Sequence, residues 1–217
     1  AYELASCLVG SEMCIRDRDN SLKRLKTDYI DLYQLHWPER KTNFFGRLGY
    51  EHKDGTDWNK FEDVLSTLDK IIKSGKIKSF GVSNFTANQM DMFKGKVEIL
   101  YNQINLSLTH LDHMFDGTLE YMQANNILPM AYSPLGSYFK EENGKIKEVV
   151  DKLKNKYGCT DYQLLISWLL KHPSKVYPVV GTTKSDRIKS TLESLKIEID
   201  LIDWFELLEA SIGKRVP

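Results

Sequence analysis

TDYIDLYQLHWP, residues 27–38, predicts a buried β-strand that ends in a single histidine. The centre, Tyr29 to Leu35, is rich in β-branched and aromatic residues and nearly continuous in apolar character, as expected of a strand covered on both faces. Pro38 ends the strand because proline has no N–H to donate to a sheet. His36 therefore lies at the carboxyl end of the strand, where barrels of parallel strands place the side chains that do chemistry. Such a histidine can donate a hydrogen bond or move a proton near neutral pH, although a structural histidine bonded to a backbone carbonyl fits the same position.

The composition excludes several classes of protein. The chain has 217 residues, enough for one substantial core, and its 30 Lys+Arg residues balance 30 Asp+Glu residues. A net charge of zero gives no electrostatic case for binding nucleic acid or an acidic membrane, and no apolar run is as long as a membrane span. No secretory signal is visible, and an odd, sparse set of three cysteines argues against a disulfide framework. We therefore expect a cytoplasmic protein in which Cys159 packs as a small apolar side chain.

The first eighteen residues do not follow the pattern of the rest. Leu8 to Asp17 read LVGSEMCIRD, with neither a helical stripe nor an alternation of apolar and polar residues. The string resembles a translated sequencing-library adapter, although an ordinary N-terminal extension is the alternative. We expect residues 1–18 to be a non-native or disordered extension and residues 19–217 to form the folded domain.

From Asp19 onward, strand patterns alternate with helix patterns, which predicts an α/β protein with a parallel sheet and crossover helices. A long loop that contains several aromatic residues, 38–57, separates the first strand from the next helix. The expected strands are 29–35, 77–82, 100–106, 128–132 and 176–180, and the expected helices are 61–74, 86–93, 116–124, 145–157, 161–170, 185–194 and 202–212, with a further helix ending at 21–25.

Polar residues recur where the expected strands end. Because the carboxyl ends of parallel strands meet at one edge of the sheet, these residues describe a rim for binding a ligand. The rim residues are His36, Ser83, Asn84, Gln103, Tyr132, Ser133, Thr182 and Thr183.

Five stretches, in this order, resemble the aldo-keto reductases: DLYQLHWP, FGVSNF, YNQINLS, AYSPLG and VVGTTKSDRIKSTLESL. The resemblance runs from Ser21 to about Gly213, and the long aromatic loop looks closest to the Tas-like branch. It implies a (β/α)8 TIM barrel that uses NADP(H), of which this chain would hold the five C-terminal βα units, leaving the barrel incomplete. It also implies a small-molecule carbonyl substrate. His36 matches the histidine that hydrogen-bonds the carbonyl oxygen while a tyrosine, tuned by a lysine and an aspartate, supplies a proton.

The resemblance also assigns residues to the nicotinamide half of the cofactor. Ser83, Asn84 and Gln103 match the positions that hydrogen-bond the carboxamide, which needs both donors and acceptors. Tyr132 matches the aromatic residue that stacks on the nicotinamide ring. A helix cap at Ser83 and Asn84 and a core position for Tyr132 are the structural alternatives.

Further residues match the phosphate and adenine contacts of the family. A helix N-terminus attracts phosphate, but an ordinary solvated helix face would also carry Lys184 and Arg187. The sequence departs from the family at Ser190 and Thr191, where Glu-Asn usually faces the adenine. The matched residues are Ser133, Leu135 and Gly136 beside the pyrophosphate, Gly181, Thr182 and Thr183 at the helix N-terminus, Thr183 and Lys184 at the 2′-phosphate, and Arg187 at the adenine.

The family's tyrosine, lysine and aspartate precede its histidine, and no residue upstream of His36 matches them. We therefore expect the parent protein to reduce aldehydes and ketones, and this polypeptide alone to be poorly soluble and inactive. The alternative is a non-catalytic nicotinamide-nucleotide-binding module or regulatory subunit. His110 and His113 have the spacing of helical metal ligands, but no third ligand is evident and we expect no metal site.

Overall fold

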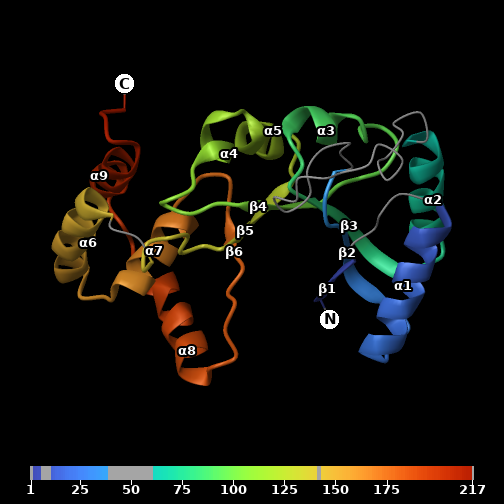
Figure 1. Ribbon diagram of the computed structural model, residues 1–217, viewed down its shortest axis with the longest axis horizontal. Helices are drawn as coiled ribbons and strands as arrows, with labels where there is room; N and C mark the ends of the chain where they lie inside the picture. Colours follow the sequence, from blue (N-terminus) through green and yellow to red (C-terminus); the bar gives the residue numbers. More distant parts are fainter. Residues whose placement is uncertain (1, 6–10, 39–60, 141–142, 217) are drawn as a thin grey trace, which may run out of the picture. The chain divides into compact units, whose positions relative to one another are not determined.

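The computed structural model of the protein describes residues 2–5, 11–38, 61–140 and 143–216, so most of the long loop expected at 38–57 lies outside the described residues. The chain forms two compact units, Ala1–Asn102 and Gln103–Pro217, whose elements are labelled in Figure 1. The first unit contains β1 (Tyr2–Ala5), α1 (Ser11–Leu25), β2 (Ile30–Leu35), α2 (Phe61–Lys73), β3 (Ile77–Ser83), α3 (Ala87–Asp91) and the start of β4 (Tyr101–Asn105). The second contains the rest of β4 and α4 (Asp112–Phe115), α5 (Thr118–Ala124), β5 (Leu128–Tyr132), α6 (Gly144–Tyr157), α7 (Asp161–Leu170), β6 (Tyr177–Pro178), α8 (Ser185–Glu193), the 3-10 turn η3 (Ser194–Lys196) and α9 (Leu201–Ile212).

Parallel strands covered by two helices build the first unit. β1 pairs with β2 and β2 with β3, both parallel, and the N–H of Leu100, just before β4, donates to the carbonyl of Phe80 in β3 (2.9 Å). α1 and α2 lie side by side (Figure 1). The apolar face of α2 points into the core, because Leu68 and Ile71 are completely buried. The alternation of strands and helices expected from the sequence is therefore present in this unit.

The N-terminal segment differs from the expectation in its secondary structure. The helix expected to end near Leu25 begins at Ser11, inside the segment that shows no helical stripe when taken alone. Cys14, Arg18 and Leu22 are buried at intervals of four residues, so the apolar stripe becomes visible only when residues beyond 17 are included, and a charged residue interrupts it. Cys14 is also disulfide-bonded, which the sparse cysteines did not predict. The assignment of residues 1–18 to a foreign sequence stays a prediction.

In the second unit, β5 pairs parallel with β6, and the N–H of Val179 extends the ladder by donating to the carbonyl of Ala131 (2.8 Å). β6 has only two residues, shorter than the predicted strand 176–180. The helix predicted from Asp116 begins at Thr118, because Gly117 adopts a left-handed φ of 84° and the Asp116 carboxylate accepts the N–H of Thr118 (2.8 Å). The short helix α4 was not predicted.

Two interactions hold α9 in the second unit, where it lies beside α6 (Figure 1). Trp168 of α7 and Trp204 of α9 stack with ring centroids 5.2 Å apart, and each indole N–H donates to the other residue's carbonyl (3.1 and 2.9 Å). The Asp203 carboxylate accepts hydrogen bonds from Lys156 Nζ (2.6 Å) and from the hydroxyl of Tyr157, both at the end of α6. The helix predicted at 161–170 is confirmed as α7, and its apolar residues Leu164, Leu165, Trp168 and Leu169 are buried.

None of the helices that the structure describes combines the length and the apolar composition that crossing a membrane requires.

The Asp203 carboxylate predicts how the second unit responds to acid. Burial opposes its ionisation, but the hydrogen bonds from Lys156 and Tyr157 outweigh burial and lower the pKa of the carboxyl. A pKa that is lowered on folding stabilises the native state above the ordinary aspartate pKa, and this stability is lost as the pH falls through the folded-state value. We expect Asp203→Asn to lower the free energy of unfolding by about 1–3 kcal/mol at pH 7 and by less near pH 3, measured by urea denaturation.

Asp200→Asn is the matched control, because Asp200 bonds the same Lys156 (2.9 Å) while its side chain is 66% exposed, against 9% for Asp203. Its effect should be below about 1 kcal/mol, as for surface ion pairs. Equal losses in the two variants would contradict the importance of burial.

Candidate functional site

The predicted catalytic histidine and two predicted cofactor residues come together in the first unit. His36 follows β2 directly, and Ser83 and Asn84 stand at the end of β3, the parallel neighbour of β2. The register pairs Leu35 with Val82, so the two strands deliver these residues at the same edge of the sheet. This is the arrangement that the rim of polar residues predicted.

Asn84 connects the two strand ends. Its Nδ2 donates to the carbonyl oxygen of His36 (3.1 Å) and to Ser83 Oγ (3.0 Å). The residue has a φ of 64°, in the left-handed region that asparagine tolerates better than most residues. Ser83 is 1% exposed and Asn84 8% exposed, so the contacts are shielded from bulk water. The backbone of the histidine is thus positioned by a residue of the neighbouring strand.

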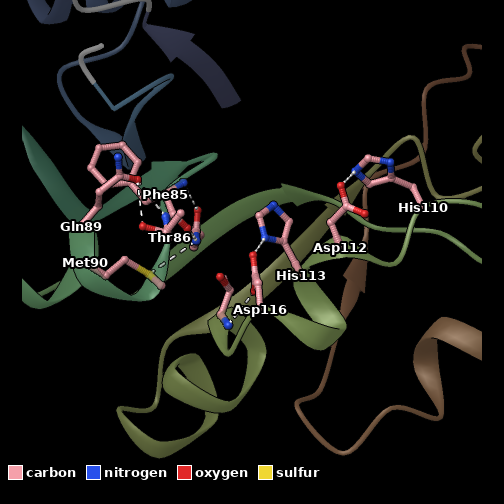
Figure 2. A network of polar contacts seen from close by, with 10 residues as sticks. Phe85, Thr86, Gln89, Met90, His110, Asp112, His113 and Asp116 are labelled. Atoms are coloured by element: carbon pink, nitrogen blue, oxygen red, sulfur yellow. Dashed lines mark hydrogen bonds and ion pairs between the residues drawn. The ribbon is translucent and has the colours of Figure 1, made fainter. Parts of the chain in front are cut away.

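Asn102, at the start of β4, is a positioning residue that the sequence reasoning missed. Its Nδ2 donates to the carbonyl of Phe85 (2.8 Å), and its Oδ1 accepts the N–H of Phe85 (3.4 Å). The helix that follows is capped by Gln89, whose Oε1 accepts the N–H (2.9 Å) and the hydroxyl (3.2 Å) of Thr86 (Figure 2). The signal available in the sequence was a strand with three amide side chains, Asn102, Gln103 and Asn105. Thr86 is the N-cap of α3 and forms a capping box with Gln89.

The environment of His36 favours the neutral imidazole. The side chain is half-buried, and burial lowers its pKa from the ordinary histidine value. The neutral ring keeps one N–H and can still donate one hydrogen bond. Its ring centroid lies 5.9 Å from that of Trp37, so one side of the imidazole faces an aromatic residue. The group can polarise a carbonyl oxygen without bringing a full charge into the site.

Tyr29 and Tyr33, in and beside the strand that ends at His36, have other roles. Tyr33 is completely buried, its hydroxyl donates to the carbonyl of Cys14 (3.3 Å), and burial raises its pKa far above the ordinary tyrosine value. Tyr29 lies under Lys78, whose Nζ is 3.6 Å from the ring centroid. Tyr33 is therefore poorly suited to donate a proton to a substrate.

In the second unit the turn after β5 has the geometry of a tight loop. Ser133 and Gly136 have φ values of 50° and 51°, and the N–H of Gly136 donates to the carbonyl of Ser133 (2.7 Å). A Cβ at Gly136 would overlap the hydroxyl oxygens of Ser107 and Thr109. The glycine is thus required by packing within the unit, whatever else approaches the turn.

Tyr132, at the end of β5, is half-buried, and burial raises the pKa of its hydroxyl. Leu135 is partly exposed in the turn, and its carbonyl accepts the N–H of Tyr138 (3.2 Å). Gln103 is 5% exposed and lies on β4. The stacking and carboxamide roles assigned to Tyr132 and Gln103 stay predictions.

The residues predicted to meet the phosphates follow β6. Because β6 pairs parallel with β5, Gly181, Thr182 and Thr183 leave the same edge of the sheet as the turn after Tyr132. The N–H of Lys184 donates to Thr182 Oγ1 (3.2 Å), which shapes the entry to α8. Lys184 and Arg187 are exposed, and neither forms an ion pair with another described residue.

The two positions that depart from the family have structural partners. Thr191 Oγ1 lies 2.6 Å from the hydroxyl of Tyr162, and the Ser190 carbonyl accepts Gln163 Nε2 (3.3 Å). Both contacts hold α8 against α7. The predicted cofactor residues thus fall in both units, with Ser83 and Asn84 in the first and the rest in the second.

The two histidines near α4 each lie beside an aspartate. His113 Nδ1 is 2.9 Å from Asp116 Oδ2 and His110 Nε2 is 3.7 Å from Asp112 Oδ2, as Figure 2 shows. Across the described ranges, no group of three or more histidine, cysteine, aspartate or glutamate side chains could hold a metal ion.

Comparison with known proteins gives a consistent result. The model of the Aldo/keto reductase family matches residues 8–211. The chain is 32% identical over 200 residues to the 6-dehydroglucose reductase of Agrobacterium fabrum (90% of this chain, 62% of that protein). It is 29% identical over 215 residues to protein tas of Escherichia coli (83% and 61%) and 31% identical over 176 residues to the NADPH-dependent alpha-keto amide reductase of Saccharomyces cerevisiae (78% and 52%). The crystal structure of a thermostable aldo-keto reductase in complex with the inhibitor epalrestat superposes with a TM-score of 0.79 at 26% identity, covering 94% of this chain and 68% of that one.

These comparisons also give the share of each relative's length that the chain covers. It spans less than two thirds of the length of the curated relatives described above. The match to the family model begins at residue 8, inside the segment that resembles an adapter.

The turn after β5 can be tested by its glycine. We expect Gly136→Ala to lower the free energy of unfolding by about 1–3 kcal/mol more than Gly117→Ala, because it adds overpacking to backbone strain. Gly117 is the matched control, since it also has a positive φ (84°) but nothing lies within 4 Å of its added Cβ. The measurement is urea denaturation followed by tryptophan fluorescence, and equal losses would argue against close packing at Ser107 and Thr109.

Proposed function

This chain belongs to the aldo/keto reductase family, and from that premise we propose that the complete protein reduces aldehydes and ketones to alcohols with NADPH. The chain supplies the histidine that orients the carbonyl and most of the residues that bind the cofactor. The observation that carries the proposal is the Asn84 side chain, which joins the ends of β2 and β3 and so positions His36 beside Ser83. The NADPH-dependent relative from yeast supports the choice of cofactor.

When bound, the nicotinamide would supply hydride to the carbonyl carbon, and the proton for the oxygen would come from the family's tyrosine, which no residue upstream of His36 matches. The neutral imidazole of His36 donates a hydrogen bond to the carbonyl oxygen, and that bond strengthens as negative charge develops there. A donor preorganised in this way is worth about 10²–10³ in rate. The hydrogen bond from Asn84 to the His36 carbonyl keeps the backbone in place, so little reorganisation is needed during the reaction.

The remaining predicted contacts bind and orient the cofactor. Ser83, Asn84 and Gln103 offer hydroxyl and amide groups to a carboxamide. Tyr132 provides an aromatic face for the nicotinamide ring. The turn from Ser133 through Leu135 to Gly136 follows the pyrophosphate, and the cations of α8 take the charged adenosine end.

Lys184 offers a test of the cofactor proposal. The exposed ammonium, unpaired within the described part of the chain, is available to a 2′-phosphate, and a charge-assisted hydrogen bond contributes about 1.5–3 kcal/mol. We expect Lys184→Ala to weaken NADPH binding about tenfold and NADH binding far less, measured by isothermal titration calorimetry on the full chain. Lys189→Ala is the matched control, because Lys189 is an exposed lysine of the same helix. Equal losses for the two nucleotides would reject a 2′-phosphate contact.

We further propose that the 217-residue chain alone binds the nucleotide without turnover. One support is Tyr33, whose buried hydroxyl donates a hydrogen bond to the carbonyl of Cys14. The other is the order of catalytic residues in the family, in which the proton-donating tyrosine precedes the histidine. The expected result is NADPH binding by calorimetry together with no consumption of NADPH, followed at 340 nm, in the presence of an aromatic aldehyde. Turnover by this chain would contradict the proposal.

A non-catalytic nicotinamide-nucleotide-binding module is the second candidate. It is favoured by the same observation, that the Tyr33 hydroxyl donates a hydrogen bond to the carbonyl of Cys14 in α1. The complete protein distinguishes the two functions. Aldehyde-dependent oxidation of NADPH supports the reductase, whereas tight binding without oxidation supports the binding module.

A further inference from the structure

A separate cavity lies in the second unit, and none of the predicted cofactor residues lines it. Its volume is about 300 Å³, at the lower end of the range for small-molecule sites. It is bordered by α4, by the residues that follow α7 and by α9. The lining residues are Met114, Phe115, Lys171, His172, Pro173, Leu201, Trp204, Phe205 and Leu208.

The buried part of the cavity presents a preformed aromatic surface. Trp204 is 7% exposed, and its stacking on Trp168, with two reciprocal hydrogen bonds, fixes the plane of the indole. Phe205 meets Trp204 edge-on, with ring centroids 5.1 Å apart and an interplanar angle of 89°. A flat ring that entered the cavity would meet aromatic groups whose orientations are already set, so binding would cost little side-chain entropy.

The rim of the cavity keeps large apolar side chains in water. Phe115 is 63% exposed, Leu201 62% and Phe205 37%. Burying such side chains is favourable by about 25 cal/mol per Å² of apolar surface, and their clustering around one cavity marks a binding surface more strongly than scattered exposure does. An apolar ligand group would remove this surface from water.

The polar groups of the cavity favour an anion. Lys171 is exposed and forms no ion pair with any residue that the structure describes. The N–H of Ser174 donates to His172 Nδ1 (3.2 Å), so the neutral imidazole carries its proton on Nε2 and can donate there. No aspartate or glutamate lines the cavity. The lining therefore offers two donors and no carboxylate, and the nearest acidic influence is Glu120, which interacts electrostatically with His172.

We propose that this cavity binds a small aromatic carboxylate, with the ring between Trp204, Phe205 and Phe115 and the carboxylate at Lys171 and His172. The ring of the ligand matches the aromatic lining and the exposed apolar rim. Its carboxylate matches the ammonium of Lys171, which has no ion-pair partner among the described residues. The site is independent of the proposed reductase function, because it shares no residue with the histidine or the nucleotide contacts.

The test is isothermal titration calorimetry on the full chain, without NADPH, using indole-3-acetate and the uncharged indole-3-acetamide as probes. We expect indole-3-acetate to bind with a submillimolar Kd and at least about fivefold more tightly than the amide, because only the acid forms charge-assisted hydrogen bonds. Equal binding of the two probes, or no binding at millimolar concentration, would overturn the proposal.

Two variants locate the binding site. Lys171→Gln should weaken indole-3-acetate about threefold to tenfold and leave the amide unchanged. Leu201→Glu places a negative charge at the rim while preserving α9, because an acidic residue is favoured in the first turn of a helix and Leu201 is exposed. It should weaken the acid more than the amide. Lys147→Gln, an exposed lysine on α6, is the control and should bind both probes as the unmodified chain does. Unchanged binding of the acid in both Lys171→Gln and Leu201→Glu would place the probe elsewhere and reject the site.

Discussion

The hydrogen bond from Asn84 to the carbonyl of His36 is the contact on which the candidate site depends (3.1 Å). Parallel pairing of β2 with β3 brings the two strand ends to one edge, but pairing alone does not determine where the chain leaves each strand. The asparagine does so, because its left-handed backbone turns the chain away while its amide holds the neighbouring strand. A side-chain amide can do this in a buried place because it satisfies backbone oxygens that would otherwise lose their water.

This contact is itself supported from the next strand. Asn102 holds both backbone polar groups of Phe85, the residue that follows Asn84, so the turn is fixed on each side of the asparagine. The ring of Phe85 packs near that of Phe93, with centroids 5.9 Å apart, which anchors the turn to the apolar core. Three strands thus contribute to the position of one histidine. Losing any of these polar partners would leave buried donors or acceptors unsatisfied, at about 1–3 kcal/mol each.

The elements that could be predicted from the sequence are those with a strong local signal. β5 and α7 have the predicted bounds, because the sequence signal of each is local. β5 is an apolar run followed by a turn, and α7 has an apolar stripe that begins after a capping threonine. The strand that delivers His36 was predicted for the same reason.

The features that were missed depend on partners distant in sequence. The start of α1 was hidden because the buried stripe includes Arg18, whose charge is compensated by Asp19 (2.7 Å). Asn102 was missed because its function lies in its contact with Phe85, which no spacing rule reveals. The packing requirement at Gly136 was also missed, because Ser107 and Thr109 fill the space where its side chain would be, while its approach to the pyrophosphate stays a prediction. The periodicity of the sequence predicts which residues lie at one edge of a sheet. It does not predict which of their atoms come into contact there.

Charge pairing identifies several lysines of the second unit as structural. Lys152, Lys154 and Lys156 each have carboxylate partners within 3.0 Å, and they connect α6 to neighbouring segments. Lys171 and Lys184 have no such partner among the described residues. The chain has equal numbers of acidic and basic residues. The ammonium groups of Lys171 and Lys184, which stand where the backbone leaves a helix or a strand, are therefore local excesses of positive charge. The net charge of zero gives no overall attraction for an anion. We therefore assign selection to such local cations and to the surface beside each one: the turn after β6 for a phosphate, and the aromatic cavity beside α9 for a carboxylate on a ring.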